Sequence, residues 1–306
     1  MLILIPVWNT NNHVLINMKR LKGVWSPGSE TRIILTTLKK NRLSFVGISI
    51  IISFIFIAIF GPFIAPYDPI EMHLDERLLQ PNREFLLGTD EFGRDTLSRI
   101  IYGARVALLV SITTVVLAMC IGILIGSVSG YYGGKIDLIL MRLVDIVTSF
   151  PYIVLAVGVM AVLGRGIDKL LIVLPLTYWT AYARIVRGLV LSIKKMDYIE
   201  AAKAIGASNT HIIISHILVN VFPPSIVVGT FQLGSAILTE TSLSYLGLGI
   251  NPPAPSWGGM LSRSREYILK APLQAIIPGL AITVVILGFN LLGDALRDAL
   301  DPRLRV

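Results

Sequence analysis

Acidic side chains that could hold a cation gather in one polar segment. Asp90, Glu91 and Asp95 lie close together, and carboxylate oxygens are the ligands that calcium and magnesium prefer. An EF-hand loop needs alternating oxygen ligands and a glutamate at its far end, and this spacing has neither. Turn and cap roles explain the same acids, with Asp95 as the N-cap of a short helix whose apolar face begins at Leu97. We therefore predict no metal site here.

A second stretch has the glycines and the lysine of a phosphate-binding loop. It reads Gly130-Tyr-Tyr-Gly-Gly-Lys135. A Walker loop needs a glycine where Ser129 stands and a serine or threonine where Ile136 follows the lysine. Since no other such motif occurs in the sequence, we predict no nucleotide site on this chain and expect the stretch to form a tight cytoplasmic turn.

The remaining candidate metal ligands and ion-pair partners are few. His211 and His216 are five residues apart without acidic neighbours, which makes a poor metal site. Cys120, the single cysteine, lies within an apolar run, so we predict a packing role and no disulfide. Arg142 and Asp145 are three residues apart, a spacing that allows an ion pair on one helix face.

Two further stretches could meet a ligand or a partner. Gln232, Ser235 and Glu240 lie toward one end of an apolar run, and acids at membrane depth are usually functional or paired. They could face an aqueous path or contact another subunit, and both readings stay open. Residues 251–257 are stiffened by prolines and end in Trp257, which could dock a partner or sit in the aromatic belt of a membrane.

The polar stretch 192–218 predicts two short helices joined by a turn. Asp197 can be the N-cap of the first helix, and Glu200, three residues on, can close a capping box. Gly206 can end this helix in the left-handed region, and a second helix can begin at Ser208 or Asn209. The alanines between Glu200 and Gly206 are small, so a partner could approach this surface closely.

The composition places these elements in a membrane. Of 306 residues, 54% are hydrophobic and 15% are charged, whereas a soluble domain carries about 25% charged residues. The net charge of +8 is spread over the ends of apolar runs rather than gathered among aromatics as in nucleic-acid binding. A helix of about 20 apolar residues crosses the hydrocarbon core. We predict an all-α integral membrane protein with six transmembrane helices, one N-terminal span plus a five-span core, at 43–65, 106–128, 139–163, 170–191, 219–238 and 276–292.

The basic residues orient these spans. Most of the 27 Lys and Arg residues lie on the side of the N-terminus, and cytoplasmic loops carry the excess. We therefore predict that both termini are cytoplasmic. The expected organisation is a tail at 1–42, a span at 43–65, an extracytoplasmic segment at 66–105, and a core at 106–306 with loops at 192–218 (cytoplasmic) and 242–272 (extracytoplasmic).

The first residues bear on targeting and on the start of the chain. Residues 1–8 lack the leading positive charges and the cleavage site of a signal peptide, so we expect no cleavage. The basic sequence begins at Met18, and whether Met1 or Met18 starts the chain stays open.

Around the cytoplasmic loop the sequence resembles the permease subunits of ABC importers. Their signature is Glu-Ala-Ala, three residues, Gly, nine residues, then Ile-x-Leu-Pro. Five residues match it in register: Glu200, Ala201, Ala202, Gly206 and Leu218. His216 and Val219 stand where the signature has Ile and Pro. The resemblance implies that Glu200, Ala201, Ala202 and Gly206 form a coupling helix that sits in a cleft of an ATPase subunit; an amphipathic interfacial helix is the alternative.

Three longer stretches look like the dipeptide/oligopeptide/nickel branch of that family. They span residues 87–105, 243–258 and 290–304. The resemblance implies a non-catalytic second permease type in the cell inner membrane, paired with a related permease, two ATPases that bind ATP and magnesium, and an extracytoplasmic binding protein. It also implies uptake by alternating access, with no cofactor on this chain.

The substrate and the transport class have alternatives. Dipeptides, oligopeptides, nickel complexes and other solutes all remain open. An ion- or proton-coupled secondary transporter would be expected to show inverted repeats and broken helices, and we find no internal duplication in the sequence. An intramembrane enzyme is a further alternative, but no span has a His-x-x-Glu-His set, a Ser-His pair or two matched aspartates.

Overall fold

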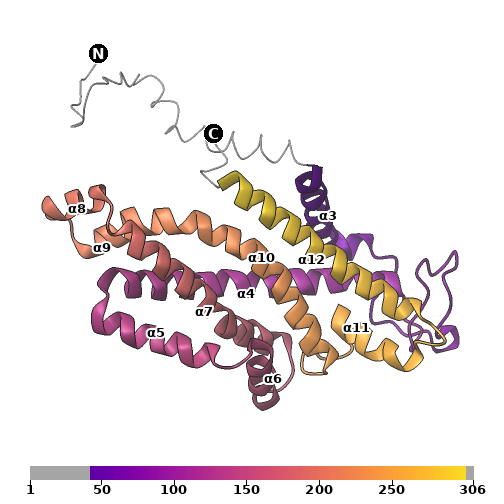
Figure 1. Ribbon diagram of the computed structural model, residues 1–306. Helices are drawn as coiled ribbons and strands as arrows, with labels where there is room; N and C mark the ends of the chain where they lie inside the picture. The colour runs from indigo at the N-terminus through magenta and orange to yellow at the C-terminus, as the bar shows by residue number, and fades with distance from the viewer. Residues whose placement is uncertain (1–41, 301–306) are drawn as a thin grey trace.

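The computed structural model describes residues 42–300, and every regular element among them is helical (Figure 1). The helices are α3 (Arg42–Ile64), α4 (Thr96–Tyr132), α5 (Gly134–Thr148), α6 (Tyr152–Leu163), α7 (Ile167–Ile193), α8 (Asp197–Ala204), α9 (Asn209–Ile212), α10 (Leu218–Tyr245), α11 (Trp257–Ser264) and α12 (Leu273–Leu300). A π turn at Ile213–Ile217 leads into α10. The all-α class is confirmed, whereas the predicted tail and the question of Met18 lie outside the described residues.

Five of the six predicted spans correspond, to within one residue at their ends, to single long helices: α3, α4, α7, α10 and α12. The span predicted at 139–163 is wrong as one helix, because α5 and α6 meet at an angle of 81°. Pro151 causes this break, since proline lacks an N–H and disfavours helix at the residue before it.

The span count itself stays a prediction. By length and composition, 4 of the described helices can cross a membrane, or up to 5 if the bent pair counts as one. Helix α7, with 27 residues, is not among them; besides Thr177 and Thr180 it carries the charged residues Asp168, Lys169, Arg184 and Arg187. The expected cap of Asp95 is confirmed, since its carboxylate accepts from Ser98 N at 2.7 Å. The short helix predicted after it, however, is continuous with the second span as the start of α4.

Helix α4 runs along the length of the molecule, and α7 packs closely against it (Figure 1). A Cβ on Gly122 would lie 2.6 Å from the carbonyl oxygen of Trp179, and one on Gly126 would lie 2.6 Å from that of Ala183. Gly130 lies on the same face at the next helical turn, and a Cβ added there would lie 3.0 Å from the carbonyl oxygen of Arg187. Small residues let helix backbones approach in this way in membranes, so Gly122 and Gly126 serve close helix packing.

The glycine-rich stretch at the end of α4 is a tight turn, as predicted. Gly133 and Gly134 have positive φ angles of 68° and 54°, a conformation that favours glycine. They reverse the chain between α4 and α5 with no intervening loop.

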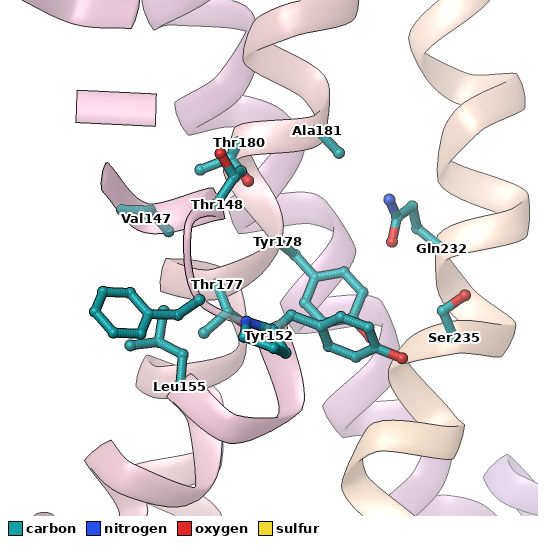
Figure 2. Close-up of a pocket in the computed structure, with 12 residues that line it drawn as sticks. Val147, Thr148, Tyr152, Leu155, Thr177, Tyr178, Thr180, Ala181, Gln232 and Ser235 are labelled. Atoms are coloured by element: carbon teal, nitrogen blue, oxygen red, sulfur yellow. The ribbon is translucent and has the colours of Figure 1, made fainter. Parts of the chain in front are cut away.

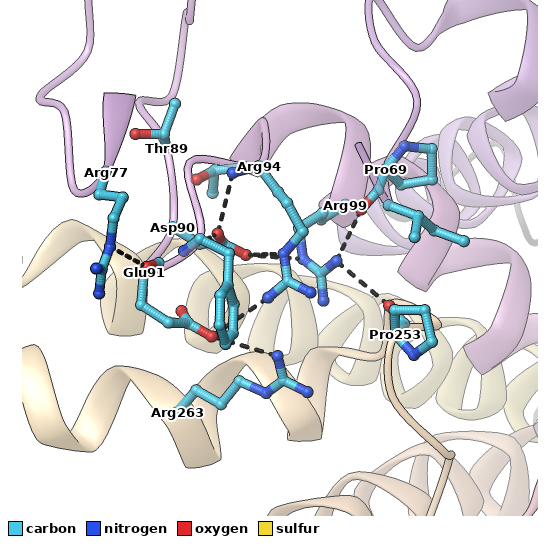
Figure 3. A network of polar contacts seen from close by, with 12 residues as sticks. Pro69, Arg77, Thr89, Asp90, Glu91, Arg94, Arg99, Pro253 and Arg263 are labelled. Atoms are coloured by element: carbon cyan, nitrogen blue, oxygen red, sulfur yellow. Dashed lines mark hydrogen bonds and ion pairs between the residues drawn. The ribbon is translucent and has the colours of Figure 1, made fainter. Parts of the chain in front are cut away.

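A buried network of arginines and acids fixes the start of α4 (Figure 3). Arg94 and Arg99 are 1% and 3% exposed, and the carboxylate of Asp90 lies 2.7 Å from Nε of Arg94 and 3.3 Å from Nε of Arg99. Glu91 lies 3.2 Å from Arg94 Nη2 and 3.3 Å from Arg263 Nη1, which joins the segment 66–95 to α11. Asp90 and Glu91 therefore neutralise buried guanidinium groups.

We expect Gly126→Val to destabilise the α4–α7 contact by about 1–3 kcal/mol, because the added side chain must push against backbone. Gly188→Val is the matched control on α7, since no described atom lies within 4 Å of its Cβ position. Thermal unfolding of the detergent-purified chain measures both. Equal melting temperatures for the two variants would contradict the close-packing account.

We expect Asp90→Asn to loosen the segment 66–95, because it leaves two buried guanidinium groups without their shared carboxylate, at about 3–5 kcal/mol. The measurement is limited proteolysis of this segment together with the melting temperature. Asp75→Asn, at an exposed position of the same segment, is the control. Unchanged protease resistance in Asp90→Asn would show that the network does not hold the segment.

Candidate functional site

The α8–α9 turn lies at the end of the molecule opposite to α11 and the segment 66–95 (Figure 1). The predicted capping box at its start is wrong. Met196 is the N-cap, in extended conformation, Asp197 is the first helical residue, and no side chain caps α8 among the described residues. Asp197 and Glu200 instead place negative charge in the first turn, where the helix dipole favours it.

The end of α8 and the start of α9 agree with the prediction. Gly206 has a φ of +84°, its N–H donates to Lys203 O, and the N–H of Ala207 donates to Ala202 O, each at 3.0 Å. These two bonds are those of a Schellman motif. Ser208 then caps α9, accepting from His211 N at 3.3 Å.

The inner face of the turn is part of a buried apolar cluster. The cluster joins α8 and α9 to the adjoining ends of the two long helices: Val186, Val190, Ile193, Ile199, Ala202, Ile212, Ile217 and Val221. Tyr131 at the end of α4 donates its hydroxyl to Asn209 Oδ1 at 2.7 Å. The turn is therefore fastened to α7, α10 and α4 together, so a displacement of the turn must be shared with them.

The outer face of the turn carries the residues that could meet a partner. Glu200, Ala201 and Gly206 are exposed, whereas Ala202 is turned inward. Ile205 is 86% exposed at the tip of α8. The sequence did not single out Ile205, because its exposure depends on how α8 packs against the rest of the chain. The face offers a small apolar knob with a carboxylate beside it.

A second candidate site lies at the break between α5 and α6 (Figure 2). There α7 and α10 help to enclose a cavity of about 460 Å³. Gln232 and Ser235 both line it, together with the aromatic rings of Tyr152 and Tyr178. Figure 2 shows Gln232 and Ser235 reaching from α10 toward these rings, with Thr148 and Thr180 at the other end. A ligand there would meet hydroxyl, amide and aromatic groups.

Glu240, unlike Gln232 and Ser235, does not line this cavity. It is 1% exposed and accepts from Ser244 Oγ at 2.7 Å. At about 100° per residue, Glu240 is turned roughly 140° away from Ser235 around α10, so its side chain packs inside the chain.

Trp257 is also not where it was expected. It is 3% exposed, because Ser256 caps α11 at this point and the indole lies against Gly103 of α4, donating to Ile100 O at 3.1 Å. The expected exposure of Trp257 is therefore not found, while docking of a partner on this loop stays a prediction. Cys120, for which a packing role was predicted, is exposed on the isolated chain.

Asp145 has a partner other than the one predicted. It pairs with Arg184 of α7 at 3.0 Å and not with Arg142. The reason is that α5 and α7 lie side by side, so a guanidinium from the neighbouring helix reaches the carboxylate.

Comparisons with known proteins agree with this architecture. Residues 122–306 match the family described as "Binding-protein-dependent transport system inner membrane component", and residues 29–81 match the "N-terminal TM domain of oligopeptide transport permease C". The chain is 45% identical to a dipeptide transport system permease protein of Alkalihalophilus pseudofirmus, over 88% of each chain. It is 40% identical to a di/tripeptide transport system permease protein of Pseudomonas aeruginosa, over 87% of this chain and 89% of the relative.

A third relative is named for another peptide. A glutathione transport system permease protein of Pectobacterium atrosepticum is 42% identical over 81% of this chain and 83% of the relative. These matches cover the helical core, the cavity and the α8–α9 turn. The chain therefore belongs to the binding-protein-dependent inner-membrane permeases of ABC importers, in the dipeptide and oligopeptide branch.

Proposed function

We propose that this chain carries short peptides inward through an ATP-driven importer and that its α8–α9 turn is the contact with the ATPase. The supporting observation is the structure of this turn: its outer face is exposed, and its inner face packs against α7 and α10. An apolar side chain as exposed as Ile205 is stabilised when a partner covers it. ATP is bound and hydrolysed on the partner, since the sequence has no phosphate-binding loop.

The cavity between α5, α6, α7 and α10 is proposed as this subunit's half of the path. It lies on the surface of the isolated chain, so a second, homologous permease would close it. The proposed assembly contains these two permeases, two ATPases and an extracytoplasmic binding protein, with both termini of this chain and the α8–α9 turn in the cytoplasm.

Peptides are the proposed cargo because the relatives above are named for dipeptides, di/tripeptides and glutathione. The aromatic and hydroxyl lining of the cavity supports this proposal over nickel complexes, for which softer or imidazole ligands would be expected. The break at Pro151 is a feature that secondary transporters also use, but membership in a binding-protein-dependent family favours the ATP-driven machine.

We expect Glu200→Ala to reduce peptide uptake and ATPase association while the chain reaches the membrane at its normal level, because Glu200 caps no helix within residues 42–300. Gly206→Val should act in the same way by forcing a β-branched residue into the left-handed region, at about 1–2 kcal/mol. Gly164→Val is the matched control: Gly164 has a φ of +85° and, like Gly206, no described atom within 4 Å of its Cβ position.

The outcomes separate coupling from folding. Normal uptake with ATPases bound in both variants would refute the coupling role. Loss of the chain from the membrane would mean that the turn serves folding. An equal loss of uptake in Gly164→Val would point to a general intolerance of valine at left-handed glycines.

We expect the segment 66–95 to be extracytoplasmic and the α8–α9 turn to be cytoplasmic. In a Cys120→Ser background, an impermeant thiol reagent applied to intact cells should label Glu84→Cys and not Thr210→Cys. Both positions are exposed, and neither side chain is used by the caps nearby. Labelling of Thr210→Cys alone would invert the topology.

A further inference from the structure

A half-exposed ion pair lies next to the cavity between α5 and α7. Nη2 of Arg184 lies 3.0 Å from Oδ1 of Asp145 and donates to Thr148 Oγ1 at 2.7 Å. The two charged side chains are 51% and 53% exposed. Thr148 also lines the cavity, and Arg184 lies one helical turn beyond Thr180 and Ala181, which line it too. The pair therefore forms the rim of the cavity at that end.

The depth of this pair excludes a lipid-facing position. Arg184 is nine residues from the end of α7 at Ile193, which corresponds to about 14 Å at the rise of an α-helix. Helix α7 is about 40 Å long on the same measure, and Arg184 lies within 170–191, the part of α7 for which the sequence predicts a membrane span. A charge facing lipid at such a depth costs about 2.5–3.5 kcal/mol or more. The exposed halves of both side chains must therefore face water or another polar group.

A second, less exposed ion pair also links α5 to its neighbours. One turn nearer the end of α7, Arg187 binds Asp137 through two nitrogens, at 2.5 Å and 2.6 Å. That pair is 33% and 19% exposed, and Asp137 also accepts from Ser129 of α4. The Arg187–Asp137 pair thus already ties α5 to both α4 and α7. The single, open contact of Arg184 with Asp145 leaves both groups able to exchange partners.

We propose that Arg184 and Asp145 bind the two charged ends of a peptide as it crosses the cytoplasmic half of the path. This rests on the proposed function and names the chemistry that the site recognises: a short zwitterionic peptide. Its carboxylate would meet the guanidinium of Arg184, and its ammonium group would meet the carboxylate of Asp145. Without a peptide, Arg184 and Asp145 pair with each other. When a peptide binds, this one ion pair is replaced by two, one to each charged end of the peptide.

The rest of the cavity suits such a ligand. Its volume of about 460 Å³ lies within the range of small-molecule sites, roughly 300–1,000 Å³. Gln232 and Ser235 offer an amide and a hydroxyl for the peptide bond, and Tyr152 and Tyr178 offer aromatic faces for side chains. Peptides that differ only in side chain share both charged ends, so this site would accept many sequences.

The test uses the complete importer, with its binding protein and ATPases, in proteoliposomes. In the double variant Asp145→Asn/Arg184→Gln, uptake of labelled dialanine should fall at least tenfold, while peptide-stimulated ATP hydrolysis and copurification of the subunits stay within twofold. The control Asp168→Asn/Lys169→Gln removes the pair at the opposite end of α7, which has a distance of 2.8 Å, and should transport normally.

A second readout reports on the cavity directly. In a Cys120→Ser background, dialanine supplied during turnover should slow thiol labelling of Ala181→Cys. When Asp145→Asn and Arg184→Gln are introduced into the same chain, dialanine should no longer slow this labelling. Normal uptake by the double variant, or a parallel loss of uptake and subunit assembly, would overturn the proposal. If the unmodified importer moved no dialanine, the proposed function would fail instead, so the two failures are distinguishable.

Discussion

The close approach of α4 and α7 is the constraint on which the other features depend. Without side chains at Gly122, Gly126 and Gly130, the backbone of α4 lies against the carbonyl groups of α7. The two helices are held together by van der Waals contacts along their lengths. Such packing drives helix association in membranes, where lipid tails are as apolar as the side chains and no hydrophobic effect favours association. Helix α7 is thereby fixed along its length, and it carries one wall of the cavity, Arg184 and, at its end, the α8–α9 turn.

This arrangement relates the two candidate sites physically. The α8–α9 turn is packed into the adjoining ends of α7 and α10, and the same two helices bear Tyr178 and Gln232 in the cavity. A force applied to the turn would therefore reach the cavity through two continuous helices. The opposite wall of the cavity is formed by α5 and α6. It is interrupted at Pro151, where these two helices meet at an angle of 81°.

Local signals were predictable from the sequence, whereas contacts between distant segments were not. The left-handed end at Gly206 and the caps at Ser208 and Asp95 depend on a few neighbouring residues, and all three are confirmed. The N-cap expected at Asp197 was wrong, because Met196 takes the extended conformation of the cap and the helix starts at Asp197, one residue earlier than expected. Contacts between side chains were harder to predict. The indole of Trp257 donates to a backbone carbonyl of α4. The carboxylate of Glu240 accepts from the hydroxyl of Ser244.

We propose that the α8–α9 turn docks on the ATPase through the face that carries Ile205, which is 86% exposed in this chain. The most direct measurement is the rate of thiol labelling of Ile205→Cys, in a Cys120→Ser background, for the isolated chain and for the importer with its ATPases. The account predicts rapid labelling of the isolated chain and at least tenfold slower labelling once the ATPases are bound. Equal rates in the two states would contradict it.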